Sequence, residues 1–205
     1  MTRRILNVTS IAASTTALAT QVTSTGAALT LAATAPTDGL AHLVTLTSAG
    51  GVDLSGVAFT VAGFDADGHS VTESIAAGPN GTTVTSTKWY ASGISVKPAA
   101  TMSAKLMDVG IAASCLSVAK SISLDGRNGH FTLGISTAVL TGSPTWTLQH
   151  TFDNVTWYDD ATIASKTSAT ETSSITPVSA LRLKITAYGG VNLTVLQFGN
   201  VGFAD

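Results

Sequence analysis

The chain has 205 residues and a mass of 20.7 kDa, which is enough for one domain or two small ones. Charged residues make up only 11% of the chain, against about 25% in ordinary soluble domains, and 33 Thr and 22 Ser take their place. The net charge of −2 argues against a nucleic-acid-binding face. A hydrophobic fraction of 44% supports a packed core and excludes an intrinsically disordered chain.

The single cysteine and the scattered histidines limit the chemistry that the chain can perform. Cys115 rules out an internal disulfide framework and a cysteine-based zinc site. It lies in an apolar stretch, so we expect a buried, inert thiol. No G-x-S-x-G element and no phosphate-binding loop is present. The sequence therefore predicts a protein that is not an enzyme and binds no cofactor.

The N-terminal segment carries no charge from residue 5 to residue 37. Its basic start resembles that of a secretory leader, but Asn, Ser and Thr interrupt the apolar stretch that a leader needs. No run of 18 apolar residues predicts a membrane span. Uncharged, β-prone segments aggregate when left in water, so we expect residues 1–40 to form an extended arm that is covered. The covering partner is a neighbouring subunit or, alternatively, the first domain of the same chain.

The arm also supplies the residues that we expect to contact a partner. These are Arg3, Arg4, Ile5, Leu6, Val8 and Ile11. An Ala/Thr-rich stretch at residues 11–20 is the only helix candidate of the chain, and its β-branched residues weaken it.

Period-two alternation of apolar and polar residues predicts strands through the rest of the chain. In chain order the expected strands are 27–32, 42–47, 57–63, 69–75, 82–88, 93–97, 103–107, 116–123, 130–136, 145–152, 181–185 and 193–198. The Asp65-Ala66-Asp67-Gly68 turn predicts a hairpin over residues 57–75, and residues 125–129 predict a second turn. Glu73 and Lys88 are expected to form a cross-strand ion pair.

This strand spacing is typical of small sandwiches. We predict an all-β fold with two small antiparallel β-sandwich or jelly-roll-like domains and the N-terminal arm. The first domain covers residues 41–112, with strands from the arm as a possible addition, and the second covers residues 113–205.

Two groups of aspartates have the spacing of weak cation sites: Asp65 with Asp67, and Asp153 with Asp159 and Asp160. No bidentate Glu of a calcium loop follows the first group, whose side chains we expect to bond backbone amides of a hairpin turn, and a turn at Asp153-Asn154 explains the second. We therefore predict no metal site, and we expect Trp157 to fill the core of the second domain.

Two segments carry a resemblance to virion structural proteins of tailed bacteriophages. In residues 57–98 the matching elements are the G-x-D-x-D-G turn, Thr72-Glu73, the G-P-N-G turn at 78–81, and T-V-x-S-T-K over 83–88, which is followed by Trp89 and Tyr90. In the second half they are Q-x-T-x-D with the following Trp157, over residues 145–160, and P-V-x-A-x-R within 177–186. Residues 1–40 match no pattern of this family.

The resemblance implies a non-enzymatic, many-copy component of the virion that is assembled in the host cytoplasm. A capsid decoration or cement protein is the expected role, and a neck or tail accessory protein is the alternative. Implied partners are copies of the same chain and other virion proteins, namely the major capsid, portal-proximal or tail proteins, with no direct contact to nucleic acid or membrane. The run from Gln149 to Trp157 also resembles discoidin-like jelly rolls, so a glycan-binding host-adhesion module using Trp157 and Tyr158 is a further alternative.

Overall fold

The computed structural model describes residues 4–121, 133–141, 143–168, 170–174, 178–189 and 193–200. Within these residues the regular elements are β-strands and one 3-10 turn, so the predicted all-β class is confirmed. The chain divides into two compact units. The N-terminal unit is residues 12–116, and the C-terminal unit combines residues 1–11 with residues 117–205.

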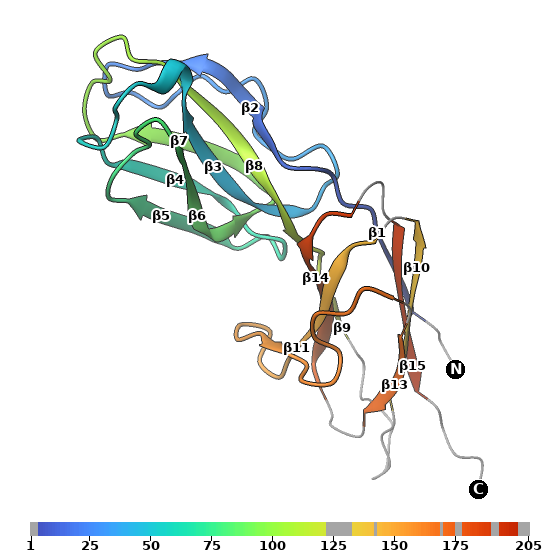
Figure 1. Ribbon diagram of the computed structural model, residues 1–205. Coiled ribbons are helices and arrows are strands. Elements are labelled where there is room, and N and C mark those ends of the chain that lie inside the picture. Colours follow the sequence, from blue (N-terminus) through green and yellow to red (C-terminus); the bar gives the residue numbers. More distant parts are fainter. Residues whose placement is uncertain are drawn as a thin grey trace, which may run out of the picture. The chain divides into compact units, whose positions relative to one another are not determined.

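The N-terminal unit consists of two antiparallel sheets with strand orders β2-β8-β3-β6 and β5-β4-β7 (Figure 1). The strands are β2 Ser14–Val22, β3 Ala41–Ser48, β4 Phe59–Phe64, β5 Ser70–Ile75, β6 Thr83–Tyr90, β7 Ser92–Pro98 and β8 Met107–Leu116, with the 3-10 turn η1 at Ala49–Gly51. Fully buried side chains from both sheets form the core, among them Val44, Leu46, Phe59, Val61, Tyr90, Val96 and Val109. Tyr90 joins the sheets directly, because its hydroxyl donates to the Val61 carbonyl at 3.3 Å.

Strand β8 runs through the domain boundary that the sequence analysis places at residue 112. The division lies between Leu116 and Ser117. A glycine inside a strand can mark a close approach of another backbone. At Gly110 this is the case, because a Cβ atom there would overlap the backbone of Ser14 and Thr15 in β2.

The second part of the N-terminal segment is built into the N-terminal unit. The stretch at residues 11–20, the only helix candidate, is not helical, and from Ser14 onward it forms part of β2, which pairs with β8. Residues 27–32, expected to be a strand, instead follow the outer edge of β7, where the Leu29 amide donates to Val96 O at 2.8 Å. Further along, the Ile94 amide donates to Thr34 O at 2.9 Å. The segment thus covers the backbone edge of β7 from within the chain.

The C-terminal unit also contains two antiparallel sheets. One has the order β1-β15-β10-β13, and the other contains β12-β11-β14 with β9 added to β14. The strands are β1 Arg4–Val8, β9 Lys120–Ser121, β10 Leu133–Thr141, β11 Thr145–Thr151, β12 Tyr158–Asp159, β13 Thr170–Ser174, β14 Ala180–Ala187 and β15 Leu193–Asn200. The turn expected at 125–129 lies outside the described residues.

The first strand of the chain belongs to a sheet formed by its last third. β1 pairs with β15 from Arg4↔Phe198 to Val8↔Thr194, and the Val8 side chain is fully buried. For residues 1–40 the structure agrees with the alternative interpretation at β2, which joins the first domain, and corrects both interpretations at β1. β1 completes the C-terminal unit and β2 completes the N-terminal unit, so both strands already have a partner within the chain.

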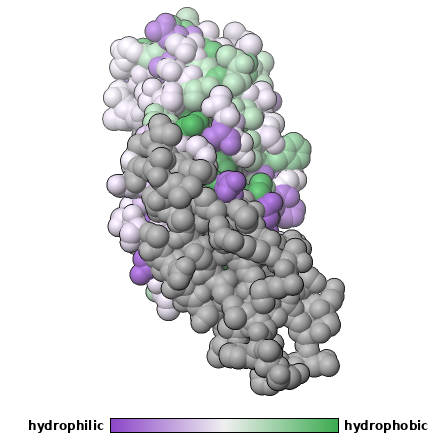
Figure 2. Space-filling model, turned by 90° about the vertical axis from the view of Figure 1, so that its right-hand side faces the viewer, coloured by the Kyte–Doolittle hydropathy of each residue, from purple (hydrophilic) through white to green (hydrophobic). Residues whose placement is uncertain are grey.

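Strand β14 shows the predicted alternation of burial, whereas in β11 the polar Thr147 and Gln149 are buried as well as the apolar residues. Trp146 and Leu148 of β11 lie opposite Ile185 and Leu183 of β14, and all four are buried. Gln149 pairs with Arg182 on the other, polar face of the sheet. Among the residues that Figure 2 colours, pale near-neutral hydropathy predominates, as expected for a surface rich in Ser and Thr.

Candidate functional site

The Asp65–Gly68 turn uses its carboxylate for the backbone. Asp65 Oδ1 accepts from the amides of Asp67 at 2.9 Å and His69 at 2.8 Å. Gly68 has a φ of +85°, which few other residues adopt. The turn joins β4 to β5 in register from Phe59↔Ile75 to Phe64↔Ser70, so the predicted hairpin is confirmed.

Strand β6 bulges opposite Val44 of β3. Leu43 lies opposite Trp89 and Thr45 opposite Thr85, so three residues of β6 face one residue of β3. Such a bulge leaves backbone groups without their ladder partners. Ser86 supplies a substitute, because its Oγ accepts from the Val44 amide at 2.8 Å and donates to Lys88 O at 3.0 Å.

Glu73 of β5 caps the same bulge from the other sheet. Its carboxylate accepts from the amides of Thr87 at 2.9 Å and Lys88 at 3.0 Å, and from Thr87 Oγ1 at 3.0 Å. Lys88 Nζ donates back to Thr72 O at 2.8 Å. The prediction of a Glu73–Lys88 ion pair is therefore wrong. The Glu73 carboxylate binds the backbone of β6, and the Lys88 ammonium group binds the backbone of β5. We call Thr72, Glu73, Ser86, Thr87 and Lys88 the bulge latch.

The latch predicts a graded loss of stability. Glu73→Ala removes the acceptor of three donors and should lower the free energy of unfolding by about 1.5–3 kcal/mol, which is what a hydrogen bond to a charged group contributes. Glu73→Gln keeps one acceptor oxygen and should lose less. Urea unfolding measures both variants, with Ser74→Ala on the exposed face of β5 as the control. Equal stability of all three variants would contradict the latch.

Asp153 fixes the loop between β11 and β12. Its carboxylate accepts from the amides of Thr156 at 2.7 Å and Val155 at 2.9 Å, and from the hydroxyls of Thr156 and Thr151 at 3.0 Å each. Asn154 follows with a φ of +60°, which confirms the turn predicted at Asp153 and Asn154. These hydrogen bonds, chiefly from the Thr156 and Val155 amides, hold the Asp153 pKa well below its usual range. The loop is therefore preorganised.

Because the pKa of Asp153 is lowered in the folded protein, the stability that its carboxylate contributes depends on pH. Because the folded pKa lies below the unfolded value of about 4, the contribution is complete above that pH and disappears as the pH falls through the folded pKa. We expect the thermal midpoint to fall less steeply below about pH 5 in Asp153→Asn than in the unaltered protein. Asp67→Asn, which removes the same charge elsewhere, serves as the control. Parallel pH curves for the two variants would contradict this assignment.

A polar network covers the outer face of β11 and β14. Arg182 Nε donates to Gln149 Oε1 at 2.8 Å, and Gln149 Nε2 donates to Asp159 Oδ1 at 2.6 Å. Lys184 Nζ lies 3.2 Å from Asp159 Oδ2. Partial burial raises the Asp159 pKa, but the hydrogen bonds from Gln149 and Lys184 outweigh it, and the net shift is downward.

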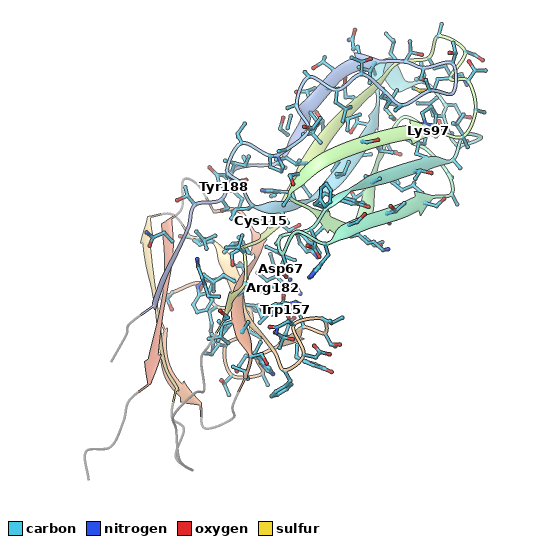
Figure 3. All side chains as sticks on the ribbon, turned by 180° about the vertical axis from the view of Figure 1, so that it is seen from behind. Asp67, Lys97, Cys115, Trp157, Arg182 and Tyr188 are labelled. Carbon is cyan, nitrogen blue, oxygen red and sulfur yellow. The ribbon has the colours of Figure 1, made fainter. Side chains whose placement is uncertain are left out.

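Trp157 extends this network. The Arg182 guanidinium carbon lies 4.0 Å from the centroid of the Trp157 ring, and Figure 3 shows the two side chains together. Arginine stacks on aromatic faces in this way through cation–π attraction. Trp157 is half-buried on the outer face, so the prediction that it fills the core is wrong. Trp146 takes that place.

Three aromatic side chains gather beside this loop, and we call them the aromatic cluster: His150, Phe152 and Tyr158. The His150 ring centroid is 5.5 Å from that of Phe152 and 6.0 Å from that of Tyr158. The Phe152 and Tyr158 rings are about half-exposed, at 51% and 50%. The alternation of β11 gave no sign of this exposure, since it places Phe152 on the same face as buried Leu148.

Trp157 and Tyr158 do not form the joint platform that the glycan-binding alternative requires. Tyr158 pairs with His150, whereas Trp157 stacks on Arg182, which pairs with Gln149. Gln149 and His150 are successive residues of β11 and point to opposite faces, so the two rings lie on opposite sides of the sheet.

The proposed cation ligands are engaged separately. The carboxylate of Asp160 accepts from Thr162 Oγ1 at 2.7 Å and from the Thr162 and Ile163 amides at 2.9 and 3.1 Å. In the described part of the chain no three His, Cys, Asp or Glu side chains are arranged to hold a metal ion. Nor does that part contain a helix long and apolar enough to cross a bilayer.

One buried polar pair was not anticipated. His42 Nδ1 lies 2.8 Å from Ala112 O, and its Nε2 lies 2.9 Å from Asp38 Oδ2, with both side chains buried. His42 pairs in register with Cys115. Cys115 is fully buried as expected, and this burial raises the pKa of its thiol well above the usual value.

Comparison of the chain with protein-family models, curated proteins and solved structures gives no match.

Proposed function

We propose that this chain is a non-enzymatic structural component of a tailed-phage virion, acting as a capsid-associated decoration or cement protein. One observation carries the proposal. The residues of the resemblance in the first half, Thr72, Glu73 and Ser86 to Lys88, are those of the bulge latch, which joins two sheets. The side chains of this motif hydrogen-bond to backbone groups and hold the two sheets together. The resemblance therefore concerns residues with a structural role.

Two further features favour a partner-covered scaffold. Only 11% of the residues are charged, and a surface of this kind has little protection against association. Sheet edges of the N-terminal unit are also covered by other segments of the same chain. The latch ties β5 to β6, and residues 29–34 cover β7. Covered edges suit a protein packed at high local concentration, because open edges invite unwanted strand pairing.

The alternatives differ in position and in chemistry. A neck or tail accessory protein would use the same scaffold at lower copy number. A glycan-binding adhesion module is less well supported, since Trp157 and Tyr158 lie on opposite faces.

Density-gradient purification of the phage particles that contain this chain under the proposal provides the test. The chain should comigrate with infectious particles and remain bound after a high-salt wash, as a component covered by apolar contacts would. Recovery only in the soluble fraction would overturn it. So would hydrolysis of cell-wall or glycan substrates by the pure protein, if one Asp or Glu substitution abolished that activity.

A further inference from the structure

The loop between β11 and β12 displays apolar side chains in an ordered form. Five large hydrophobic side chains are exposed in the described part of the chain, and three of them belong to this loop and its flanks: Phe152, Val155 and Tyr158. Val155 is the most exposed, at 78%. Asp153 meanwhile holds the loop with four hydrogen bonds. A rigid loop that presents apolar groups to solvent has the properties of a recognition surface.

The ring geometry favours a protein side chain over a sugar. A pyranose stacks on a flat aromatic face. The planes of Phe152 and His150 differ by 76°, and those of Phe152 and Tyr158 by 53°. Only His150 and Tyr158 are nearly parallel, at 28°, and these two rings stack on each other. The cluster therefore offers ring edges and faces in several directions, which suits the irregular surface of a protein.

The charge around the cluster selects a basic partner. Residues 150–165 contain no Lys or Arg, and two of their three Asp, Asp153 and Asp160, lie outside the network that holds Asp159 on the opposite face. Arg182 and Lys184 belong to the network on the opposite face of the sheet. Asp160 lies close enough to His150 for the two to interact electrostatically. A guanidinium or ammonium group can meet both carboxylates and aromatic faces at such a place.

We infer that the aromatic cluster, with Val155, docks a segment of another protein that carries arginine or lysine beside apolar side chains. The inference rests on the proposed function only for the statement that this partner is another component of the assembly.

The test uses the isolated full-length protein and three defined probes. These are the blocked peptides Leu-Arg-Leu-Arg and Leu-Glu-Leu-Glu, and methyl glucoside. Aromatic NMR should show the Phe152 and Tyr158 ring signals shifting with the arginine peptide at about millimolar concentration, with little response to the other two probes. The shift should weaken as salt is added.

Two variants and a control complete the test. The double variant Phe152→Ser with Tyr158→Ser should weaken binding of the arginine peptide at least about tenfold. Val155→Ser, at the most exposed position, should weaken it to a smaller extent. Phe64→Ser removes an exposed phenylalanine of the N-terminal unit and should leave binding unchanged. No shift with the arginine peptide, equal shifts with both peptides, a response to the sugar alone, or unchanged binding in the double variant would each overturn the inference. None of these outcomes bears on whether the protein belongs to the virion.

Discussion

A Gly110→Val variant is expected to lose about 3 kcal/mol or more of unfolding free energy, the upper end of what overpacking a well-packed structure costs. The side chain at position 110 would overlap the backbone of Ser14 and Thr15, so β2 could no longer lie against β8. Displacement of β2 would also expose Leu18, which is fully buried. Backbone atoms cannot move aside as the end of a flexible side chain can. Urea unfolding of the purified variant measures the loss.

Gly56→Ala is the matched control for this variant. A Cβ atom at Gly56 meets no atom within 4 Å, and the residue does not have a positive φ. This change should leave the stability within about 0.5 kcal/mol of the unaltered protein. If Gly110→Val were equally harmless, β2 would not be docked on β8 as described.

The second large effect is expected at the buried pair of Asp38 and His42. The His42→Leu substitution leaves the Asp38 carboxylate, whose side chain is 4% exposed, without its imidazole partner. It also removes the ring that contacts the Ala112 carbonyl. Removing one partner of a buried hydrogen-bonded pair costs about 1–3 kcal/mol, and more where the group left behind is charged, which is a large part of the stability of a typical domain.

A double-mutant cycle separates the pair from its surroundings. Asp38→Leu combined with His42→Leu should be less destabilised than the sum of the two single variants, because the carboxylate and the imidazole are removed together and neither is left buried without the other. Urea unfolding of the four proteins gives the coupling free energy. A coupling energy near zero would show that the two side chains do not stabilise each other.

The strands were predictable wherever apolar and polar residues alternate on a half-buried surface. The hairpin of β4 and β5 follows from its period-two pattern and from an Asp-x-Asp-Gly turn whose chemistry is local. The apolar faces of β11 and β14 follow for the same reason. Local patterns of this kind report which side of a strand is buried.

The errors arose where a distant segment decides the structure. Residues 11–20 look weakly helical on their own, but β8 offers a strand edge that makes them β2. Gly110 lies inside β8 because β2 passes directly over it, which local sequence does not reveal. Likewise, β1 pairs with β15, which lies almost at the other end of the sequence. Such pairings depend on segments far apart in the sequence, so the local sequence does not predict them.

The candidate site was predictable only in part. The turn at Asp153 and Asn154 was expected, because aspartate and asparagine favour such turns. The sequence did not predict that Phe152 is exposed or that Trp157 stacks on Arg182, because large aromatic residues are usually buried. Glu73 was correctly assigned to a link between strands, but its acceptors had to satisfy a bulge in β6 that only the register reveals.

The number of copies in each particle tests the central claim most directly. Purified particles would be resolved on a quantitative gel, with the major capsid protein as the internal standard. A decoration or cement protein predicts copies in the hundreds, in a simple ratio to the capsid protein, because each symmetric capsid position offers the same contact. About a dozen copies or fewer would place the chain at the neck or tail and contradict the decoration role. Its absence from the particles would contradict the structural account as a whole.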